Sequence, residues 1–170
     1  HLLNVNQELC YLQPIVRSAV DLINVQFSAK NIRIENQVSE FVLPVHGDPS
    51  RIEQVLLNLL YNACKFTTEG RVQIRSATDD ENLRTEIHDS GPGVKDGDHQ
   101  LIFEAFEQEN PTLAEGLGLG LSISKEIIEE HGGQIGVEPS PLGGACFWFS
   151  LPLAQPAQIP LTENENNEKG

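Results

Sequence analysis

The sequence Asn58-Leu-Leu-Tyr-Asn62-Ala-Cys-Lys65-Phe-Thr67 places two carboxamides and one lysine among closely spaced apolar residues. Across residues 52–66 the apolar positions recur at intervals of three and four, which is the spacing of a helix that buries one face. Asn58, Asn62 and Lys65 fall together on another side of that helix, because positions four and seven apart share a face. The stretch therefore predicts a core helix that also carries a site.

The three polar side chains of this helix suit a phosphate ligand and its metal ion. Amide oxygens are neutral, hard ligands of the kind that Mg²⁺ accepts, and Mg²⁺ is usually shared with substrate phosphates. A lysine one turn away supplies a point charge for the same phosphates. Asp48 and Pro49 predict the helix start, as N-cap and first helical residue. Taken alone, an Asn-x-x-x-Asn pair is more often a solvated polar face, so the choice depends on motifs elsewhere in the chain.

The charge of the chain limits its partners. The 170 residues carry a net charge of -14, which argues against nucleic acid and anionic membrane surfaces as partners, because binding to either depends on Lys and Arg. We expect no direct membrane contact from this segment. A phosphate ligand would have to be held locally, by a metal ion and backbone N–H groups. Cys10, Cys64 and Cys146 are far apart and odd in number, which predicts reduced core thiols and a cytoplasmic location.

Hydrophobic periodicity and turn residues predict helices alternating with strand pairs. The expected helices span residues 14–30, 49 to about 67–70, and 120–131, and the expected strand pairs are 32–38 with 41–45, 71–75 with 83–87, and 134–138 with 145–151. Antiparallel strand pairs separated by helices indicate a two-layer α+β sandwich. One domain over residues 1–154 accounts for these elements, and the polar residues 155–170 are expected to form a disordered tail.

The region between residues 89 and 120 contains no long expected element, which is typical of a binding loop or lid. It opens with Asp89-Ser-Gly91-Pro-Gly93, an aspartate at a strand end followed by two glycines. Glycines let the backbone approach a flat ligand closely, and a carboxylate can accept a hydrogen bond from an exocyclic amine such as that of adenine. Seen alone, the same motif is more often an ordinary turn.

The run Gly116-Leu-Gly118-Leu-Gly120-Leu ends this region and leads directly into the expected helix. Successive backbone N–H groups at a helix start point toward one place, which is an arrangement that binds phosphate. The run lacks the Gly-Lys-Ser/Thr of a P-loop and the spacing of a dinucleotide-binding turn. Alone it would indicate flexible packing, but the asparagine helix and the aspartate motif precede it in order, which favours a nucleotide site.

Together these motifs resemble the catalytic, ATP-binding domain of sensor histidine kinases, in the GHKL superfamily with the Bergerat fold. Residues 58–67 resemble its N box, 89–93 its first glycine box, 102–106 its F box and 116–121 its second glycine box, and the likeness runs from about residue 12 to 153. The resemblance implies a two-layer α/β sandwich with a mixed, mostly antiparallel sheet covered on one face by three helices. It also implies ATP and Mg²⁺ as cofactors, and transfer of the γ-phosphoryl group to a histidine on a preceding helical domain.

The resemblance further implies a role for each candidate residue. Asn62 would ligate Mg²⁺, with Asn58 as a second ligand or a support, and Lys65 would contact phosphate, so these three form the expected catalytic set. Asp89 would hold the adenine amine. The residues expected to line and close the nucleotide pocket are Gly91, Gly93, Phe106, Gly116, Leu117, Gly118, Leu119 and Gly120.

The chain departs from the family pattern in its lid. Glu115 and Leu117 stand where the family often has glycine and threonine, and the segment between Phe106 and Gly116 is short, with three acids and no Lys or Arg. No cation is therefore available there to reach the γ-phosphate, so the sequence supports adenine binding more strongly than turnover. Phe103 and Phe106 fit either plain core residues or anchors of the lid.

An ATP-hydrolysing module, or a degenerate domain used only for partner contacts, is the alternative interpretation. Hydrolysing relatives carry a glutamate general base one turn before the metal asparagine. Here Asn58 stands at that position, and an amide cannot accept a proton from water. This residue favours the kinase.

The resemblance also implies the partners of the chain. None of its five histidines heads a long helix, as the phosphoacceptor of this family would, and the chain contains no methionine, so we expect a fragment of a longer protein. The expected partners are an upstream dimerisation and histidine-phosphotransfer domain and the receiver domain of a response regulator, within a homodimer. The chain alone is not expected to be active.

Overall fold

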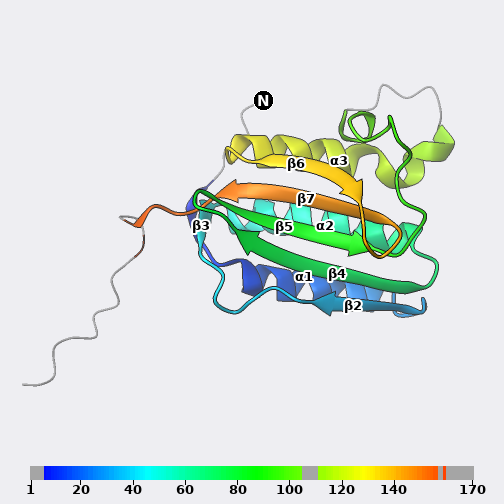
Figure 1. Cartoon of the computed structure of the whole chain (residues 1–170), viewed down its shortest axis with the longest axis horizontal. Helices are drawn as coiled ribbons and strands as arrows, with labels where there is room; N and C mark the ends of the chain where they lie inside the picture. The colour runs from blue at the N-terminus through cyan, green and yellow to red at the C-terminus, as the bar shows by residue number, and fades with distance from the viewer. Residues whose placement is uncertain (1–5, 105–110, 157–158, 160–170) are drawn as a thin grey trace, which may run out of the picture.

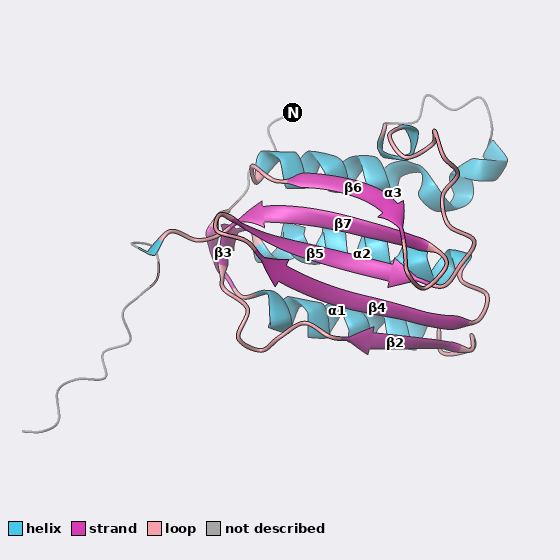
Figure 2. Ribbon diagram, viewed as in Figure 1, coloured by secondary structure: helices cyan, strands magenta, loops and turns pink. Residues whose placement is uncertain are grey.

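The computed structural model describes residues 6–104, 111–156 and 159, and along 111–119 it describes the backbone alone. Its elements are β1 (Glu8–Cys10), α1 (Leu12–Gln26), β2 (Ile32–Asn36), β3 (Val45–Gly47), α2 (Pro49–Phe66), β4 (Gly70–Thr78), β5 (Asn82–Asp89), the 3-10 helix η1 (Leu101–Phe103), α3 (Pro111–Glu130), β6 (Gln134–Pro139) and β7 (Ala145–Pro152). One five-stranded sheet has the order β2-β4-β5-β7-β6, and α1, α2 and α3 cover one of its faces (Figures 1 and 2). The predicted two-layer α+β sandwich is confirmed.

Two of the three predicted hairpins are present, and the first is wrong. β4 pairs antiparallel with β5, and β6 pairs antiparallel with β7. β2, however, pairs parallel with β4, while β3 pairs with β1. Beside β4, β2 forms a ladder of backbone hydrogen bonds, and its Ile32 and Ile34 side chains pack against the core. In the other predicted strand, Pro44 has no N–H to donate to a ladder and the Phe41 side chain is exposed.

The core lies between the inner face of the sheet and the helices. α2 is the central helix, in contact with both α1 and α3. The buried side chains at this junction include Leu56, Leu59 and Leu60 of α2 and Ile74, Ile87 and Phe149 of the sheet. Burial of such aliphatic and aromatic groups is the main source of folding free energy. Cys10, Cys64 and Cys146 are free and buried, as predicted.

Both ends of α2 are satisfied by charged side chains. The Asp48 carboxylate accepts hydrogen bonds from the backbone N–H groups of Ser50 and Arg51, at 3.0 and 3.2 Å, as expected of an N-cap. At the other end, Lys30 Nζ donates to the carbonyl oxygens of Cys64 and Lys65, both at 2.9 Å, and of Thr67 at 3.1 Å. A cation there also complements the helix dipole. The helix that carries the asparagines is therefore fixed at both ends.

α3 begins at Pro111 rather than at residue 120, which corrects the expected loop. The glycine-rich run 116–120 lies inside the helix. Leu113, Leu117 and Leu121 are spaced four apart, and leucine is a good helix former, although each glycine costs about 1 kcal/mol relative to alanine. The helix ends as predicted, with Gly132 at a φ of 76°. No helix in the described part of the chain is long and apolar enough to cross a membrane.

The two ends of the described domain meet at β3. Cys10 of β1 pairs with Val45, and Val45 also forms a bridge to Leu153, just after β7. The Ala154 N–H donates to the carbonyl oxygen of Pro44 at 2.9 Å. β3 lies at one end of the sheet, and the tip of β5 lies at the other (Figure 1).

Candidate functional site

Asp89 ends β5 and is the most firmly placed of the predicted residues. It is 5% exposed. Its Oδ1 accepts hydrogen bonds from the N–H groups of Gly91, at 2.9 Å, and Ala145, at 3.1 Å, while its main-chain carbonyl accepts from Gly144 N–H at 3.2 Å. Among the described residues, no donor contacts Oδ2. One carboxylate oxygen is therefore fixed by the backbone, and the other is available to a ligand.

The environment of Asp89 changes its acidity. Burial raises the pKa of this carboxyl, and the N–H groups of Ala145 and Gly91 and the nearby His88 oppose that rise without cancelling it. A carboxylate that has lost water and has one free oxygen gains from a donor brought by a ligand. An amine of the ligand that donates to Oδ2 would supply this hydrogen bond.

Glycines surround this carboxylate, and at one of them there is no room for a side chain. A Cβ on Gly144 would lie 2.1 Å from Asp89 Oδ1 and 2.6 Å from its carbonyl oxygen. A Cβ on Gly91 would lie 3.1 Å from the same Oδ1 and 3.2 Å from the carbonyl oxygen of Phe66. Gly93 adopts a φ of 78°, which favours glycine, and lies close to Gly144. The predicted Gly91 and Gly93 are thus beside Asp89.

Thr67, the C-cap of α2, joins this group to the asparagine helix. It is 0% exposed, and its Oγ1 has no hydrogen-bond partner among the described residues. Its Oγ1 would lie 3.2 Å from a Cβ on Gly91. An unpaired buried hydroxyl costs about 1–3 kcal/mol, and such groups often mark a place where a ligand or water binds. A ligand held by Asp89 would lie within reach of this hydroxyl.

Asn58 connects α2 to α3. Its Nδ2 donates to the carbonyl oxygen of Gly120 at 3.1 Å and to Ser124 Oγ at 3.2 Å. Ser124 Oγ in turn donates to the Gly120 carbonyl at 2.7 Å. Because the nitrogen faces α3, Oδ1 of Asn58 remains available as an acceptor or a metal ligand. Asn58 and Gly120, predicted as parts of one site, are in contact.

Asn62 and Lys65 complete the polar face of α2. Asn62 lies one turn after Asn58 and is only 4% exposed. Lys65 is in the last turn of the helix, with Nζ 5.9 Å from the centre of the Phe66 ring. A buried amide and a lysine at the end of a helix are consistent with the predicted metal and phosphate roles.

The remaining predicted residues are only partly placed. Phe106 lies outside the described residues. Gly116, Leu117, Gly118 and Leu119 belong to the first half of α3, where the backbone alone is described. Phe103, by contrast, is buried, and its ring meets the Phe147 ring edge to face at 6.2 Å between centroids. Packing against β7 therefore accounts for Phe103.

The site thus consists of two groups joined by α2. One is formed by Asp89, Gly91, Thr67 and Gly144, and the other by Asn58 with Gly120 and Ser124. The part played by Thr67, Gly144 and Ala145 was not predicted from the sequence. The doublet Gly143-Gly144 before a strong strand was the one available signal for a close backbone approach.

The donors and acceptors present fit an adenine nucleotide with its magnesium ion. Asp89 Oδ2 and Thr67 Oγ1 could bind a base that carries an amine. The amide oxygens of Asn58 and Asn62 are hard, neutral ligands of the kind that Mg²⁺ accepts.

Comparison with known proteins identifies the family of the chain. Residues 47–155 match the family described as "Histidine kinase-, DNA gyrase B-, and HSP90-like ATPase". Sensor protein GacS of Pseudomonas syringae pv. syringae is 37% identical over 151 residues, which cover 84% of this chain and 17% of GacS. The chain therefore spans about a sixth of the length of this curated relative.

Two solved structures are similar along most of the chain. Full-length ShkA in complex with AMPPNP has a TM-score of 0.80 at 32% identity, covering 91% of this chain and 33% of ShkA. The catalytic domain of histidine kinase ThkA has a TM-score of 0.76 at 31% identity, covering 87% of this chain and 96% of that domain. ThkA has also been solved with the response regulator protein TrrA, at a TM-score of 0.75, 30% identity, and coverage of 88% of this chain and 42% of that one.

The fold, the asparagine helix and the coverage of a complete catalytic domain define a class. The chain belongs to the family of histidine kinase-, DNA gyrase B- and HSP90-like ATPases, as a catalytic, ATP-binding domain of the histidine kinase type.

Proposed function

We propose that this domain binds Mg-ATP and donates the γ-phosphoryl group to a histidine on a preceding helical domain of the same protein. The observation that carries the proposal is the Asp89 carboxylate, with one oxygen held by two backbone N–H groups and the other without a donor among the described residues. The AMPPNP complex of ShkA supports an adenine nucleotide as the ligand.

The chain's own residues would act by positioning and by neutralising charge, which is the main protein contribution to phosphoryl transfer. Asp89 would orient the base through its free oxygen. Asn62 and Asn58 would hold Mg²⁺, which when bound neutralises phosphate charge, and Lys65 would contact phosphate. Because Asn58 is an amide bonded to α3, it has no carboxylate with which to activate water, which favours transfer over hydrolysis.

The acceptor would have to be supplied by another domain. His131 is buried, with Nδ1 donating to the Ile127 carbonyl and Nε2 accepting from Asp48 N–H. His88 is buried in the sheet. Neither can be presented to a nucleotide.

We propose that the acceptor histidine lies on an upstream dimerisation and histidine-phosphotransfer domain, that the whole protein is a homodimer, and that this domain is cytoplasmic. The ThkA–TrrA complex supports the receiver domain of a response regulator as a further partner.

The decisive variant is Asp89→Asn. The amide oxygen can keep the hydrogen bonds from Gly91 and Ala145, which places the new NH₂ group where Oδ2 was. A donor then faces the adenine amine, a buried mismatch of roughly 1–3 kcal/mol, so calorimetric titration with Mg-ADP should show an affinity about fivefold to a hundredfold lower. Asp80→Asn, in the exposed turn between β4 and β5, is the control. Unchanged affinity in the Asp89 variant would mean that the base is bound elsewhere.

Transfer itself is tested with γ-labelled ATP. Residues 1–170 alone should neither label themselves nor turn over more than a trace of ATP, because no nucleophile is positioned near the nucleotide. Addition of the upstream helical domain should produce an acid-labile phosphohistidine. Multiple turnovers by the isolated chain would instead favour a hydrolase.

A further inference from the structure

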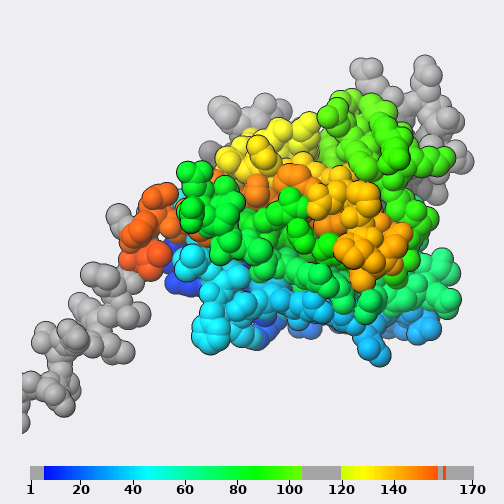
Figure 3. Space-filling view, viewed as in Figure 1, coloured from blue at the N-terminus to red at the C-terminus, as the bar shows by residue number. Residues whose placement is uncertain are grey.

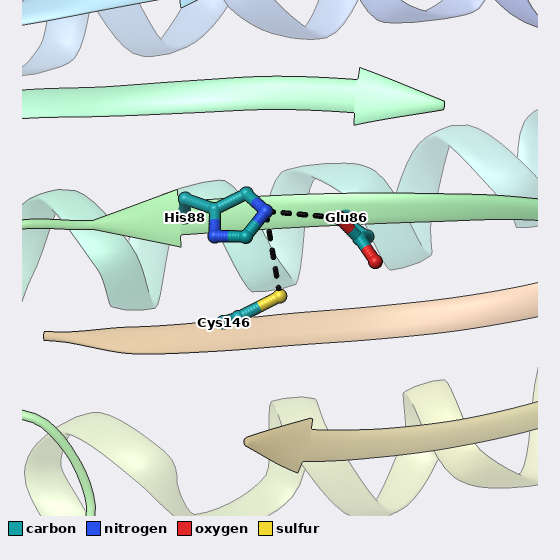
Figure 4. Close-up of side chains that lie close together, drawn as sticks. All are labelled: Glu86, His88 and Cys146. Carbon is teal, nitrogen blue, oxygen red and sulfur yellow. Dashed lines mark hydrogen bonds and ion pairs between the residues drawn. The ribbon is translucent and has the colours of Figure 1, made fainter. Parts of the chain in front are cut away.

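The outer face of the sheet, which no helix covers, is turned toward the viewer in Figure 3. It carries a cluster of three different metal-binding groups (Figure 4). Glu86 and His88 project from β5, and Cys146 projects from the neighbouring β7, where it pairs with His88. His88 Nε2 lies 2.9 Å from Glu86 Oε2 and 3.7 Å from Cys146 Sγ, and one ligand atom from each residue lies within 4.8 Å of the others. His88 and Cys146 are buried.

We propose that Glu86, His88 and Cys146 bind one divalent cation of the zinc type. Zinc takes imidazole nitrogen, thiolate and carboxylate oxygen together, at about 2.0 to 2.3 Å. Two such ligands at a tetrahedral angle are about 3.6 Å apart, close to the 3.7 Å between His88 Nε2 and Cys146 Sγ. A thiolate among the ligands selects against the hard cation expected at the asparagines of α2.

The side chains around the cluster hold its ligands in position. Ser140 Oγ lies 3.1 Å from His88 Nδ1, on the side of the ring away from Glu86 and Cys146. Arg84 Nε donates to Glu86 Oε1 at 2.8 Å, which leaves Oε2 directed at the cluster. Partners of this kind, which bind the far atom of each ligand, fix ring orientation and strengthen metal binding. The free atoms of His88 and Glu86 therefore converge with the sulfur.

One proton must leave when the cation binds. The contacts of Glu86 with His88 and Arg84 outweigh the effect of burial and lower the pKa of Glu86, so its Oε2 only accepts and His88 Nε2 carries the hydrogen between them. Burial, assisted by the charges of Glu86 and Glu138, raises the pKa of the Cys146 thiol to about 12. When the cation takes the place of the Nε2 hydrogen, His88 changes tautomer and carries its hydrogen on Nδ1, which faces Ser140 Oγ, so the ring stays neutral. The sulfur loses its hydrogen, and that single proton passes to solvent.

Zinc titration of the metal-stripped chain tests the site. Calorimetry should show one Zn²⁺ bound per chain, and Co²⁺ should give the charge-transfer absorption of a cobalt–thiolate bond. Cys146→Ser should abolish that absorption and lower the Zn²⁺ affinity at least about tenfold. Cys10→Ser is the matched control, because Cys10 is also buried but lies in the separate β1–β3 pair. It should change neither result.

Glu86→Gln is a second variant that preserves shape and keeps the thiol. It should also weaken Zn²⁺ binding, whereas Glu35→Gln, on a carboxylate that bonds Gln73 at 2.5 Å, should not. If Cys146→Ser fails to fold, the comparison of Glu86→Gln with Glu35→Gln tests the site instead. Absence of Zn²⁺ binding by the unaltered chain, or binding that neither Cys146→Ser nor Glu86→Gln weakens, would overturn the proposal. The three side chains would then serve only as hydrogen-bonded links between β5, β7 and the turn at Ser140.

Discussion

The two groups of the nucleotide site are built in different ways. Around Asp89, backbone groups from β5, its following turn and β7 approach so closely that Gly144 has no room for a Cβ. Around Asn58, one side chain links two helices, and a Cβ on Gly120 would meet it only at an ordinary 3.5 Å. The first group is fixed by main chain and sheet, and the second depends on one amide. Substitution should therefore affect the two groups very differently.

Gly144→Ala should have the largest effect. The new Cβ would lie 2.1 Å from Asp89 Oδ1, so either the carboxylate or the turn before β7 must move. We expect a loss of about 1–3 kcal/mol in the free energy of unfolding, measured by urea titration, as for other overpacked sites. Mg-ADP binding should fall with it, because the carboxylate that holds the base is displaced. Wild-type stability would show that the Asp89 group is not rigid.

Asn58→Ala should have a smaller and local effect. It removes the hydrogen bonds to Gly120 and Ser124, each worth about 1 kcal/mol at most after exchange with water. Hydrogen exchange should become faster over residues 120–130 and stay unchanged in β5. The control is Gln54→Ala, which removes a contact with Arg51 one turn earlier on the same helix. Equal changes in α3 and β5 would mean that the two groups are coupled.

Gly120→Ala repeats the substitution made at Gly144 in the other group. Here there is room for the Cβ and the position is helical, so the free energy of unfolding should rise by about 0.5–1 kcal/mol. Thermal or urea unfolding measures this. A loss of stability as large as that of Gly144→Ala would remove the distinction between the groups.

The smallest expected effect is a pH dependence that belongs to the Asp89 group. Because burial raises the pKa of Asp89 in the folded state above its usual 3.8, the folded protein binds this proton more tightly than the unfolded chain. That contribution to stability is complete below about pH 3.8 and is lost as the pH rises through the folded pKa. Asp89→Asn lacks the titration, so its stability relative to the wild type should rise over this interval. A difference that is constant with pH would contradict the raised pKa.

The sequence predicted the parts of the molecule whose signals are local. The cap at Asp48, the apolar stripe of α2 and the motif at Asp89 each occupy a few consecutive residues. Helical periodicity therefore gave Asn58, Asn62 and Lys65 their common face, and strand alternation gave the hairpins β4–β5 and β6–β7.

The features that the sequence did not predict depend on strand pairing between distant segments or on a balance between weak conformational preferences. Ala145 reaches Asp89 across 56 positions, through the pairing of β5 with β7. β2 pairs parallel with β4 across the whole of α2, a choice that local turn residues at 39–40 do not reveal. The run 116–120 mixes glycine with leucine, so its helical or looped state follows from small differences in free energy.

The meeting of both chain ends at β3 has a mechanical consequence. Force applied through the segments that precede β1 and follow β7 would be carried first by the β1–β3 pair and by the Val45–Leu153 bridge. The tip of β5 lies at the opposite end of the sheet (Figure 1). Tension applied at the two ends would therefore pass around Asp89 rather than through it. The described domain can be pulled at both ends as one body while the residues around Asp89 keep their arrangement.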